Sequence, residues 1–464
     1  MSTKTTWVFK TDKSRQLKDN LARYGVMLGG IMVLCALLLI FFYLLYVVQP
    51  VFESAQVTQR HQTLPTHKEY VAVGIDEQTE YAFALTQDSV VDFFDVRVNS
   101  SELSTNASNN SITISNTDFK TNSVTAFAAS AAHQGLYGFI DSHFNLRIIK
   151  PTFKATFVGG HRTLTPEVVD VFSELPLPPL FESETVLKVN ANPSPNTDPN
   201  ALSHYEIKQF VFSYEDSVLS VLIELDNNQL HFFRFVQEEN FMTGESTWLK
   251  TRTPLNFING HIIGMHISPD GSRLFILTEH ELYVVNSQFE DDINVIYNKK
   301  ISRTDANITT SQLLAGANSL MIGFNDGMIE QWFETNDQQG RDFINVRQFK
   351  TASSVANIFP EFYRRSFVTS TNDGIGYLHH ATAEAQLWQG PLTHELESSP
   401  QSAANKNAPI IDLSFAPRAN AFAVLTKQNI SVYDVSNEHP EVTWSALWQE
   451  VWYEGYPEAD YIWQ

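Results

Sequence analysis

The residues of this sequence that could do chemistry are few and scattered. His379 and His380 form the only histidine pair. Neighbouring side chains on a strand point to opposite faces, so the two rings could not share a metal ion, and we interpret both as surface histidines. Asp270, Asp326 and Asp373 each lie beside a glycine in a predicted turn. Hydrogen bonding of Asp to the turn backbone explains these residues without a carboxylate site.

Motifs for phosphate, metal or acyl chemistry are absent from the sequence. It has no glycine-rich phosphate loop, no His-Glu-x-x-His and no Gly-x-Ser-x-Gly. The single cysteine, Cys35, lies in an apolar run, so neither an intrachain disulfide nor a Cys/His zinc site of the usual spacing can form. We therefore predict no catalytic, cofactor-binding or metal-binding residue, no cofactor, no direct ATP binding and no enzymatic activity.

Composition and charge narrow the class of protein. The chain has 464 residues, 43% of them hydrophobic and 12% aromatic, which is typical of a globular protein rich in strands. Its net charge of -21 argues against nucleic acid as a partner, because phosphate binding needs clustered Lys and Arg. The same charge argues against docking of the bulk domain on an anionic membrane surface.

One segment predicts a membrane span. Residues 25–48 (GVMLGGIMVLCALLLIFFYLLYVV) contain no charge, and a helix of this length crosses a bilayer core of about 30 Å. Six basic and two acidic residues precede the span, whereas the first basic residue after it is Arg60. The positive-inside rule therefore places residues 1–24 in the cytoplasm and residues 54–464 outside. The run is longer than the apolar region of a cleaved signal peptide.

Two further segments leave their roles open. Gly25 and Gly29 match the spacing at which small residues let two membrane helices approach closely, although such matches also arise by chance. Residues 443–464 are rich in Trp and Tyr, and either form a partner surface or close the last structural repeat.

The exported part repeats one strand pattern about seven times. Each unit has a polar loop, an apolar strand, a turn and a second strand of alternating residues, which predicts paired β-strands. Equivalent positions in the seven units are Tyr81, Leu136, Val218, Leu274, Leu320, Ser366 and Ala421.

The spacing of these units suits four-stranded propeller blades, so we predict an all-β, seven-bladed β-propeller preceded by one transmembrane helix. An array of β-sandwiches is the alternative. The polar segments 98–123 and 175–200 are interpreted as insertions in the propeller.

The two ends of the chain resemble parts of a known family. Residues 23–55 (RYGVMLGGIMVLCALLLIFFYLLYVVQPVFESA) resemble the first helix of phosphate-type ABC-transporter permeases in their extended bacterial form. Residues 454–464 (EGYPEADYIWQ) resemble the junction that precedes the permease core of these proteins. The resemblance implies a large periplasmic region after the first helix, whereas the further spans and the coupling loop of the core do not follow in this sequence.

These observations together predict a membrane-anchored component of an ABC import system, with phosphate as the expected solute. Its periplasmic propeller would act as a protein-interaction module in the bacterial inner membrane, with the N-terminus in the cytoplasm. The partners implied are the inner membrane, the transporter permease and the periplasmic binding protein. The alternative is a membrane-anchored propeller scaffold for envelope protein assembly, unrelated to transport.

Overall fold

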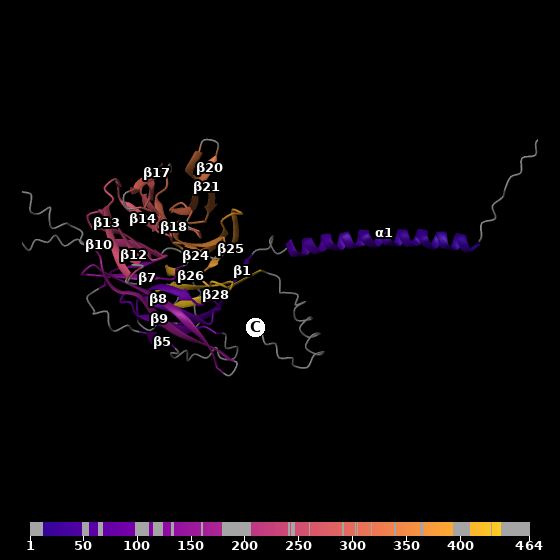
Figure 1. Cartoon of the computed structure of the whole chain (residues 1–464), viewed down its shortest axis with the longest axis horizontal. Helices are drawn as coiled ribbons and strands as arrows, with labels where there is room; N and C mark the ends of the chain where they lie inside the picture. The colour runs from indigo at the N-terminus through magenta and orange to yellow at the C-terminus, as the bar shows by residue number, and fades with distance from the viewer. Residues whose placement is uncertain are drawn as a thin grey trace, which may run out of the picture. The chain divides into compact units, whose positions relative to one another are not determined.

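The computed structural model describes most of the chain, from Lys13 in the N-terminal helix to Asn437 in the last strand (Figure 1). The described residues are 13–48, 55–63, 68–97, 111–114, 124–130, 134–158, 161–178, 206–239, 242, 246–258, 260–289, 292–301, 303, 305–316, 318–337, 340–361, 365–392, 409–427 and 429–437. They fall into two compact units, of which Val57–Ser436 is the larger.

The helix α1 spans Lys13–Val48, so it begins twelve residues before the predicted span and ends at the same residue. Its segment Asn20–Leu45 is long and apolar enough to cross a membrane, and none of it is buried within the protein. A Cβ atom added at Gly25 or Gly29 would meet nothing within 4 Å, so this face of the helix is open. The proposed close packing of another helix there stays a prediction.

Strands β1 to β28 form seven four-stranded sheets, which we number as blades in chain order. Blade 1 contains β2 (Tyr70–Ile75), β3 (Tyr81–Thr86), β4 (Val91–Asp95) and β5 (Ser111–Ile114); blade 2 contains β6 (Val124–Ala129), β7 (Tyr137–Asp141), β8 (Asn145–Val158) and β9 (His161–Pro176). Blade 3 contains β10 (Ile207–Glu215), β11 (Val218–Leu225), β12 (Leu230–Glu239) and β13 (Ser246–Pro254); blade 4 contains β14 (Ile262–Ile267), β15 (Arg273–Thr278), β16 (Glu281–Asn286) and β17 (Asn294–Lys300).

The remaining blades follow the same plan. Blade 5 contains β18 (Ile308–Leu313), β19 (Ser319–Phe324), β20 (Met328–Asp337) and β21 (Gly340–Lys350); blade 6 contains β22 (Val355–Pro360), β23 (Ser366–Thr371), β24 (Ile375–His380) and β25 (Ala385–Pro391). Blade 7 contains β26 (Ile410–Phe415), β27 (Ala421–Thr426), β28 (Ile430–Asn437) and, as its fourth strand, β1 (Ala55–Thr63).

This architecture confirms the predicted seven-bladed β-propeller. Each of the seven positions that the repeat identified lies at the start of the second strand of a blade, or within one residue of it. The agreement has a physical cause, because the second strand is buried on both faces and is therefore the most apolar strand of its blade.

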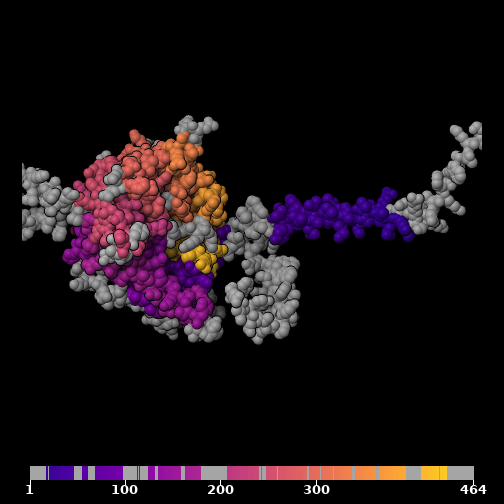
Figure 2. All heavy atoms as spheres, viewed as in Figure 1, coloured from indigo at the N-terminus to yellow at the C-terminus, as the bar shows by residue number. Residues whose placement is uncertain are grey.

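Apolar side chains fill the spaces between neighbouring blades. One buried cluster joins β6–β9 to β10–β13 around Phe212 and Phe233. Another joins the first blade to the last, with Val73 and Ala84 packed against Val432 and Leu425. The second cluster closes the ring, and Figure 2 shows residues of the last blade, in yellow, against those of the first, in indigo and purple.

The innermost strands share one irregularity. In all seven blades the register of the first strand shifts after its first residue, as between Tyr70 and Ala72 in β2. A bulge adds a residue to one strand and increases its local twist. The repetition of this bulge at one position indicates that it adapts each blade to the crowded centre of the ring.

The chain leaves the propeller beside the strand through which it enters. β28 ends at Asn437 on the side of the ring that carries the turn between β26 and β27, since Val435 donates its backbone N–H to the carbonyl of Asn420. All register-paired neighbours in the seven sheets are antiparallel. β1 is the neighbour of β28 in its sheet. An antiparallel β1 therefore begins on the side of the ring where β28 ends.

The segments interpreted as insertions are described only in part. Residues 111–114 of the segment 98–123 form β5, the fourth strand of blade 1, and the other residues after Arg97 lie outside the described residues. Leu175 and Pro176 belong to β9, while 179–200 are also outside. The aromatic run 443–464 lies entirely outside the described part, so its role stays open.

Candidate functional site

The turn between β2 and β3, residues 76–80, carries a dense set of polar contacts, and we name it the closure turn. Asp76 is buried, and its carboxylate accepts hydrogen bonds from the backbone N–H groups of Gln78 (3.0 Å), Glu80 (2.6 Å) and Tyr81 (2.7 Å). Thr79 has a φ of 59°, a conformation that few residues other than glycine adopt. The Asp76 carboxylate holds the turn in this shape by occupying its backbone donors.

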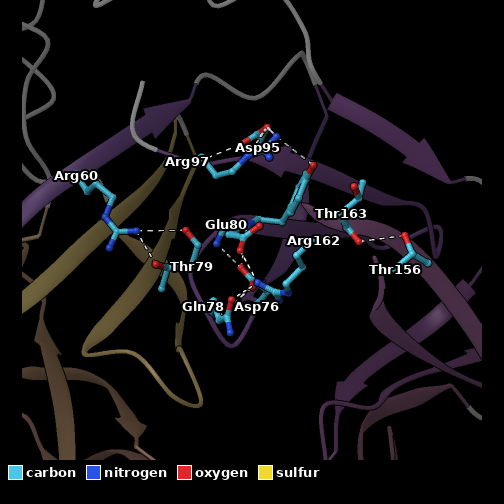
Figure 3. A network of polar contacts seen from close by, with 11 residues as sticks. Arg60, Asp76, Gln78, Thr79, Glu80, Asp95, Arg97, Thr156, Arg162 and Thr163 are labelled. Carbon is cyan, nitrogen blue, oxygen red and sulfur yellow. Dashed lines mark hydrogen bonds and ion pairs between the residues drawn. The ribbon is translucent and has the colours of Figure 1, made fainter. Parts of the chain in front are cut away.

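Three arginines from different parts of the chain converge on the closure turn, and Figure 3 shows two of them, Arg60 and Arg162. Arg60 of β1 donates to the carbonyl of Thr79 at 3.2 Å and to its hydroxyl at 2.5 Å. Arg162 of β9 bonds Glu80 at 2.6 Å and also contacts Gln78. Arg418, from the turn between β26 and β27, lies 3.0 Å from Glu77. The closure turn therefore links blades 1, 2 and 7.

Arg60 also joins the first strand of the propeller to the last. Its Nε and Nη2 atoms bond the two carboxylate oxygens of Asp434 in β28, at 2.8 and 2.5 Å. This bidentate geometry is the strong form of an Arg–carboxylate pair. Both side chains keep part of their surface exposed, so the pair stabilises the closure without a buried charge.

A fourth arginine flanks the closure turn. Arg97 bonds the carboxylate of Asp95, as Figure 3 shows, and its guanidinium lies 5.4 Å from the centre of the Tyr81 ring. The hydrogen bond that Arg97 donates to the Asp95 carboxylate raises the pKa of Arg97 above its already high value, so the guanidinium stays charged. The described polar groups of this region hold one another in place, which suits a rigid support rather than a reacting centre.

The centre of the ring contains a Ser–His pair that the sequence did not indicate. His266 of β14 and Ser311 of β18 lie 2.9 Å apart, between Nε2 and Oγ. Such a pair can activate a serine only if the histidine takes up a proton near neutral pH. Burial lowers the pKa of His266 to about 4, which makes it a weak base. The pair therefore fits a structural bond between blades 4 and 5 better than a catalytic one.

A carboxylate also faces the centre of the ring at the closure. Asp412 of β26 accepts hydrogen bonds from the backbone N–H groups of Val73 in β2 (2.9 Å) and Leu413 (2.8 Å). The bond to Val73 ties the innermost strand of blade 7 to that of blade 1. Burial raises the pKa of Asp412 to about 6, although the two hydrogen bonds act in the opposite direction.

The interpretation of both histidines as surface residues was wrong for His379. Its ring is 1% exposed and packs among Phe349, Phe367 and Tyr377, at centroid distances of 5.5, 5.0 and 6.1 Å. Burial lowers the pKa of His379 to about 4, so the ring is neutral. His380 is partly exposed, and its Nδ1 accepts a hydrogen bond from the N–H of Ala383.

The three turn aspartates lie in separate blades and bond their own turns. Asp270 accepts from the hydroxyl of Ser268 at 2.5 Å and from the N–H of Ser272. Asp326 accepts from the N–H of Met328. Hydrogen bonds from Thr371 and Ser353 lower the pKa of Asp373, despite some desolvation. The structure does not bring these carboxylates together.

The described residues give little evidence of a site for a metal ion or a small molecule. They include no group of three or more His, Cys, Asp or Glu side chains that could hold a metal ion. A cavity of about 150 Å³ lies between blades 5 and 6 and is lined by Gln331, Glu361 and Arg365 among others. This volume is below the range of about 300–1,000 Å³ that is common for small-molecule sites.

The fold and the closure define a seven-bladed β-propeller that follows an apolar N-terminal helix. No protein-family model and no curated protein matches the chain by sequence. Among solved structures, the chain is similar to the β-propeller domain of Cps50 (Swd1) from Myceliophteria thermophila. The similarity has a TM-score of 0.47 and 10% sequence identity, and covers 82% of this chain and 100% of that chain. The assignment of the fold rests on the seven sheets themselves.

Proposed function

We propose that this chain is a membrane-anchored β-propeller that works as a protein-interaction module on the outer side of the bacterial inner membrane. The observation that carries the proposal is the closure of blade 7 by β1, the strand that follows α1 after only six residues. An anchor attached through a strand of the ring holds the whole propeller, because β1 is fixed to β28 and to the closure turn. This arrangement suits a rigid propeller that α1 holds at the membrane.

An exposed apolar pair on blade 5 is the best candidate for the contact with a partner. Its residues, which we name the outer patch, are Phe333 of β20 and Ile344 of β21. The two are direct cross-strand neighbours, and they lie on the face of blade 5 opposite to Phe343, which packs against Tyr297 of blade 4.

Charged pairs lie next to the outer patch along the same two strands. Arg273 bonds Glu334, which follows Phe333 in β20, at 2.6 Å, and Lys299 bonds Asp342 of β21. An apolar centre with polar neighbours is the usual anatomy of a protein–protein interface. The outer patch therefore supports a protein partner, with no need for a catalytic group.

We further propose that the partner belongs to an ABC import system for phosphate. This step is supported by the resemblance of residues 23–55 and 454–464 to extended phosphate-type permeases. The chain would act without catalysis, by holding the transporter permease or the periplasmic binding protein beside the membrane. Its strong negative charge disfavours a role as the phosphate receptor itself, because the field of the domain repels anions.

Affinity capture of the tagged full chain from detergent-solubilised membranes tests this function. We expect permease and binding-protein components of a phosphate importer to be captured, and the double variant Phe333→Glu, Ile344→Glu to lose them at least tenfold. Leu249→Glu is the matched control, since Leu249 is 50% exposed on β13, away from the outer patch. Capture of envelope-assembly proteins in place of transporter components would favour the scaffold alternative.

A further inference from the structure

The outer edge of blade 3 is long and regular. β13 is the outermost strand of this blade, and all nine of its residues pair with β12 in one continuous register. In the part of the chain that the structure describes, the other edge of β13 is paired with no strand. An open edge presents a row of backbone N–H and C=O groups, so it can accept another strand.

The other outer strands are shorter or irregular. β5 has four residues, and the pairings of β9, β17, β21 and β25 with the strand before them each contain a register shift. This holds even for the long pair of β8 and β9, which extends beyond β7 to Val158 and His161. A bulge twists an edge strand and disfavours its pairing with another chain. Among the outer strands whose register is described, β13 is thus the long one without this protection.

The hydrogen bonds to β12 determine which backbone groups of β13 point outward. Leu255, directly after β13, donates its N–H to the carbonyl of Leu230 at 2.9 Å. Bonded and non-bonded pairs alternate along an antiparallel ladder, so the odd-numbered residues of β13 also bond toward β12. The even-numbered Trp248 and Lys250 therefore direct their N–H and C=O groups to the open edge.

The side chains along this edge differ between its two faces. Leu249 is 50% exposed, on the face that it shares with threonines. On the other face Trp248 packs against Phe172 of β9, with 5.5 Å between ring centroids, and Nζ of Lys250 lies 5.9 Å from the centre of the Phe235 ring. The edge thus offers an uncovered apolar side chain on one face, and an indole next to a cation on the other.

Two copies of β13 complement each other in one antiparallel register. When Leu249 lies opposite Leu249 of the second copy, Trp248 lies opposite Lys250, and Thr247 lies opposite Thr251. The outward backbone groups of Trp248 and Lys250 then bond each other, and the ammonium group gains a cation–π contact with the indole. Such a contact has two-fold symmetry, because each residue of one copy meets the same partner in the other.

Neighbouring registers are less favourable for the same two strands. Sliding one copy by two residues would place Lys250 opposite Lys250, and sliding it further would place Lys250 opposite Arg252. Like charges directly opposite each other destabilise a strand pair. Both registers would also bring Pro254, which has no N–H, into the new ladder. Sliding the other way shortens the ladder, because β13 begins at Ser246.

We propose that two copies of this chain pair antiparallel along β13, with Leu249 at the two-fold axis. The two blades would then form one continuous sheet. A second copy is the occupant that this edge specifies, since the same few residues supply both sides of the fit without opposed like charges. The inference depends neither on the proposed role in phosphate import nor on the outer patch of blade 5.

Charge at position 249 tests the two-fold axis. Sedimentation equilibrium of the full chain in detergent should show a dimer, and Leu249→Glu or Leu249→Lys should each weaken it about tenfold, because like charges then meet across the axis. An equal mixture of these two variants should restore the dimer. Met242→Glu is the matched control, since Met242 is 95% exposed in the same hairpin and lies outside the pairing. Leu249→Glu should still capture the proposed partners, because the outer patch lies on another blade.

Three results would overturn the proposal. They are a monomeric full chain, no recovery in the mixture, and a dimer that neither variant at position 249 weakens. The last result would place the contact elsewhere, for example in α1.

Disulfide trapping tests the register without adding charge. Cys35→Ala removes the only cysteine, and residues opposed at non-bonded positions have Cα atoms about 4.5 Å apart, within the range of a disulfide. Tagged Thr247→Cys mixed with untagged Thr251→Cys should form a mixed disulfide. Thr247→Cys mixed with Thr253→Cys is the matched control and should not. Preferential cross-linking to position 253, or equal cross-linking of both mixtures, would contradict the proposed pairing.

Discussion

His379 illustrates how packing between sheets changes the chemistry of a single residue. Alternation along a strand correctly places His379 and His380 on opposite faces of the sheet. It does not show which of the two faces other parts of the protein cover. Phe349 of β21 and Phe367 of β23 enclose the His379 ring, and its Nε2 has no hydrogen-bond partner among the residues that the structure describes. Burial of a neutral imidazole without a partner at this nitrogen lowers stability and opposes protonation.

Replacing His379 by Phe should stabilise the propeller, and more so in acid. The pKa of His379 is about 4 in the folded protein and 6.5 when unfolded. Protonation of His379 in the unfolded chain therefore costs the folded protein no stability above pH 6.5. The free energy of unfolding then decreases as the pH falls from 6.5 to 4. We expect His379→Phe to gain about 2 kcal/mol more at pH 5 than at pH 8, measured by denaturant unfolding in detergent.

The neighbouring His380 provides the control for this experiment. Its side chain is partly exposed, so His380→Phe should change stability little at either pH. An equal gain for His379→Phe at pH 5 and pH 8 would show that the ring is not held neutral by its surroundings.

At the scale of elements, the middle strands of the blades were predictable and the outer ones were not. The second strand of each blade is apolar throughout, as in SLMIGF of β19, because neighbouring sheets cover both of its faces. β1 (AQVTQRHQT) lies at an outer edge and has no apolar pattern. Its pairing with β28 depends on contacts such as Arg60–Asp434, between residues 374 positions apart, which the local sequence cannot indicate. The extension of β8 and β9 was missed for the same reason.

Removing Arg60 should weaken the closure of the ring. Arg60→Met would leave the carboxylate of Asp434 and the carbonyl of Thr79 without these hydrogen bonds. We expect a loss of about 1–3 kcal/mol in the free energy of unfolding and earlier proteolysis at β1. Arg341→Met is the control, because Arg341 is 70% exposed and lies 3.8 Å from Glu334. Equal stability of the two variants would contradict a structural role for the closure turn.

A turn of blade 5 offers a second test of the described geometry. Gly327 has a φ of +85°, and a Cβ atom there would lie 2.6 Å from the carbonyl oxygen of Thr351. Gly327→Ala should therefore cost about 2 kcal/mol or more, combining backbone strain with a clash. Gly316→Ala isolates the strain, since its φ is +81° but a Cβ would meet nothing within 4 Å. Thermal unfolding should show a clearly larger loss for Gly327→Ala, and the opposite order would refute the turn geometry.

For the whole molecule, the charges on either side of the apolar span predict on which side of the membrane the propeller lies. Six basic residues precede the apolar span 25–48, and none lies between Val48 and Arg60. The propeller should therefore lie outside the cytoplasm, with its two chain ends leaving one blade on the same side. A reporter active only in the periplasm, fused after Gln464, should be active, whereas a reporter active only in the cytoplasm should be silent. Activity of the cytoplasmic reporter would reverse the orientation.

We propose that the anchored propeller serves phosphate import through its protein contacts. This is tested most directly by the initial rate of phosphate uptake in phosphate-starved cells that lack this chain, with a complemented strain and the Phe333→Glu, Ile344→Glu variant beside it. We expect a several-fold lower rate in both the deletion and the outer-patch variant, and full recovery with the unaltered chain. Normal phosphate uptake in the deletion strain would contradict the claim.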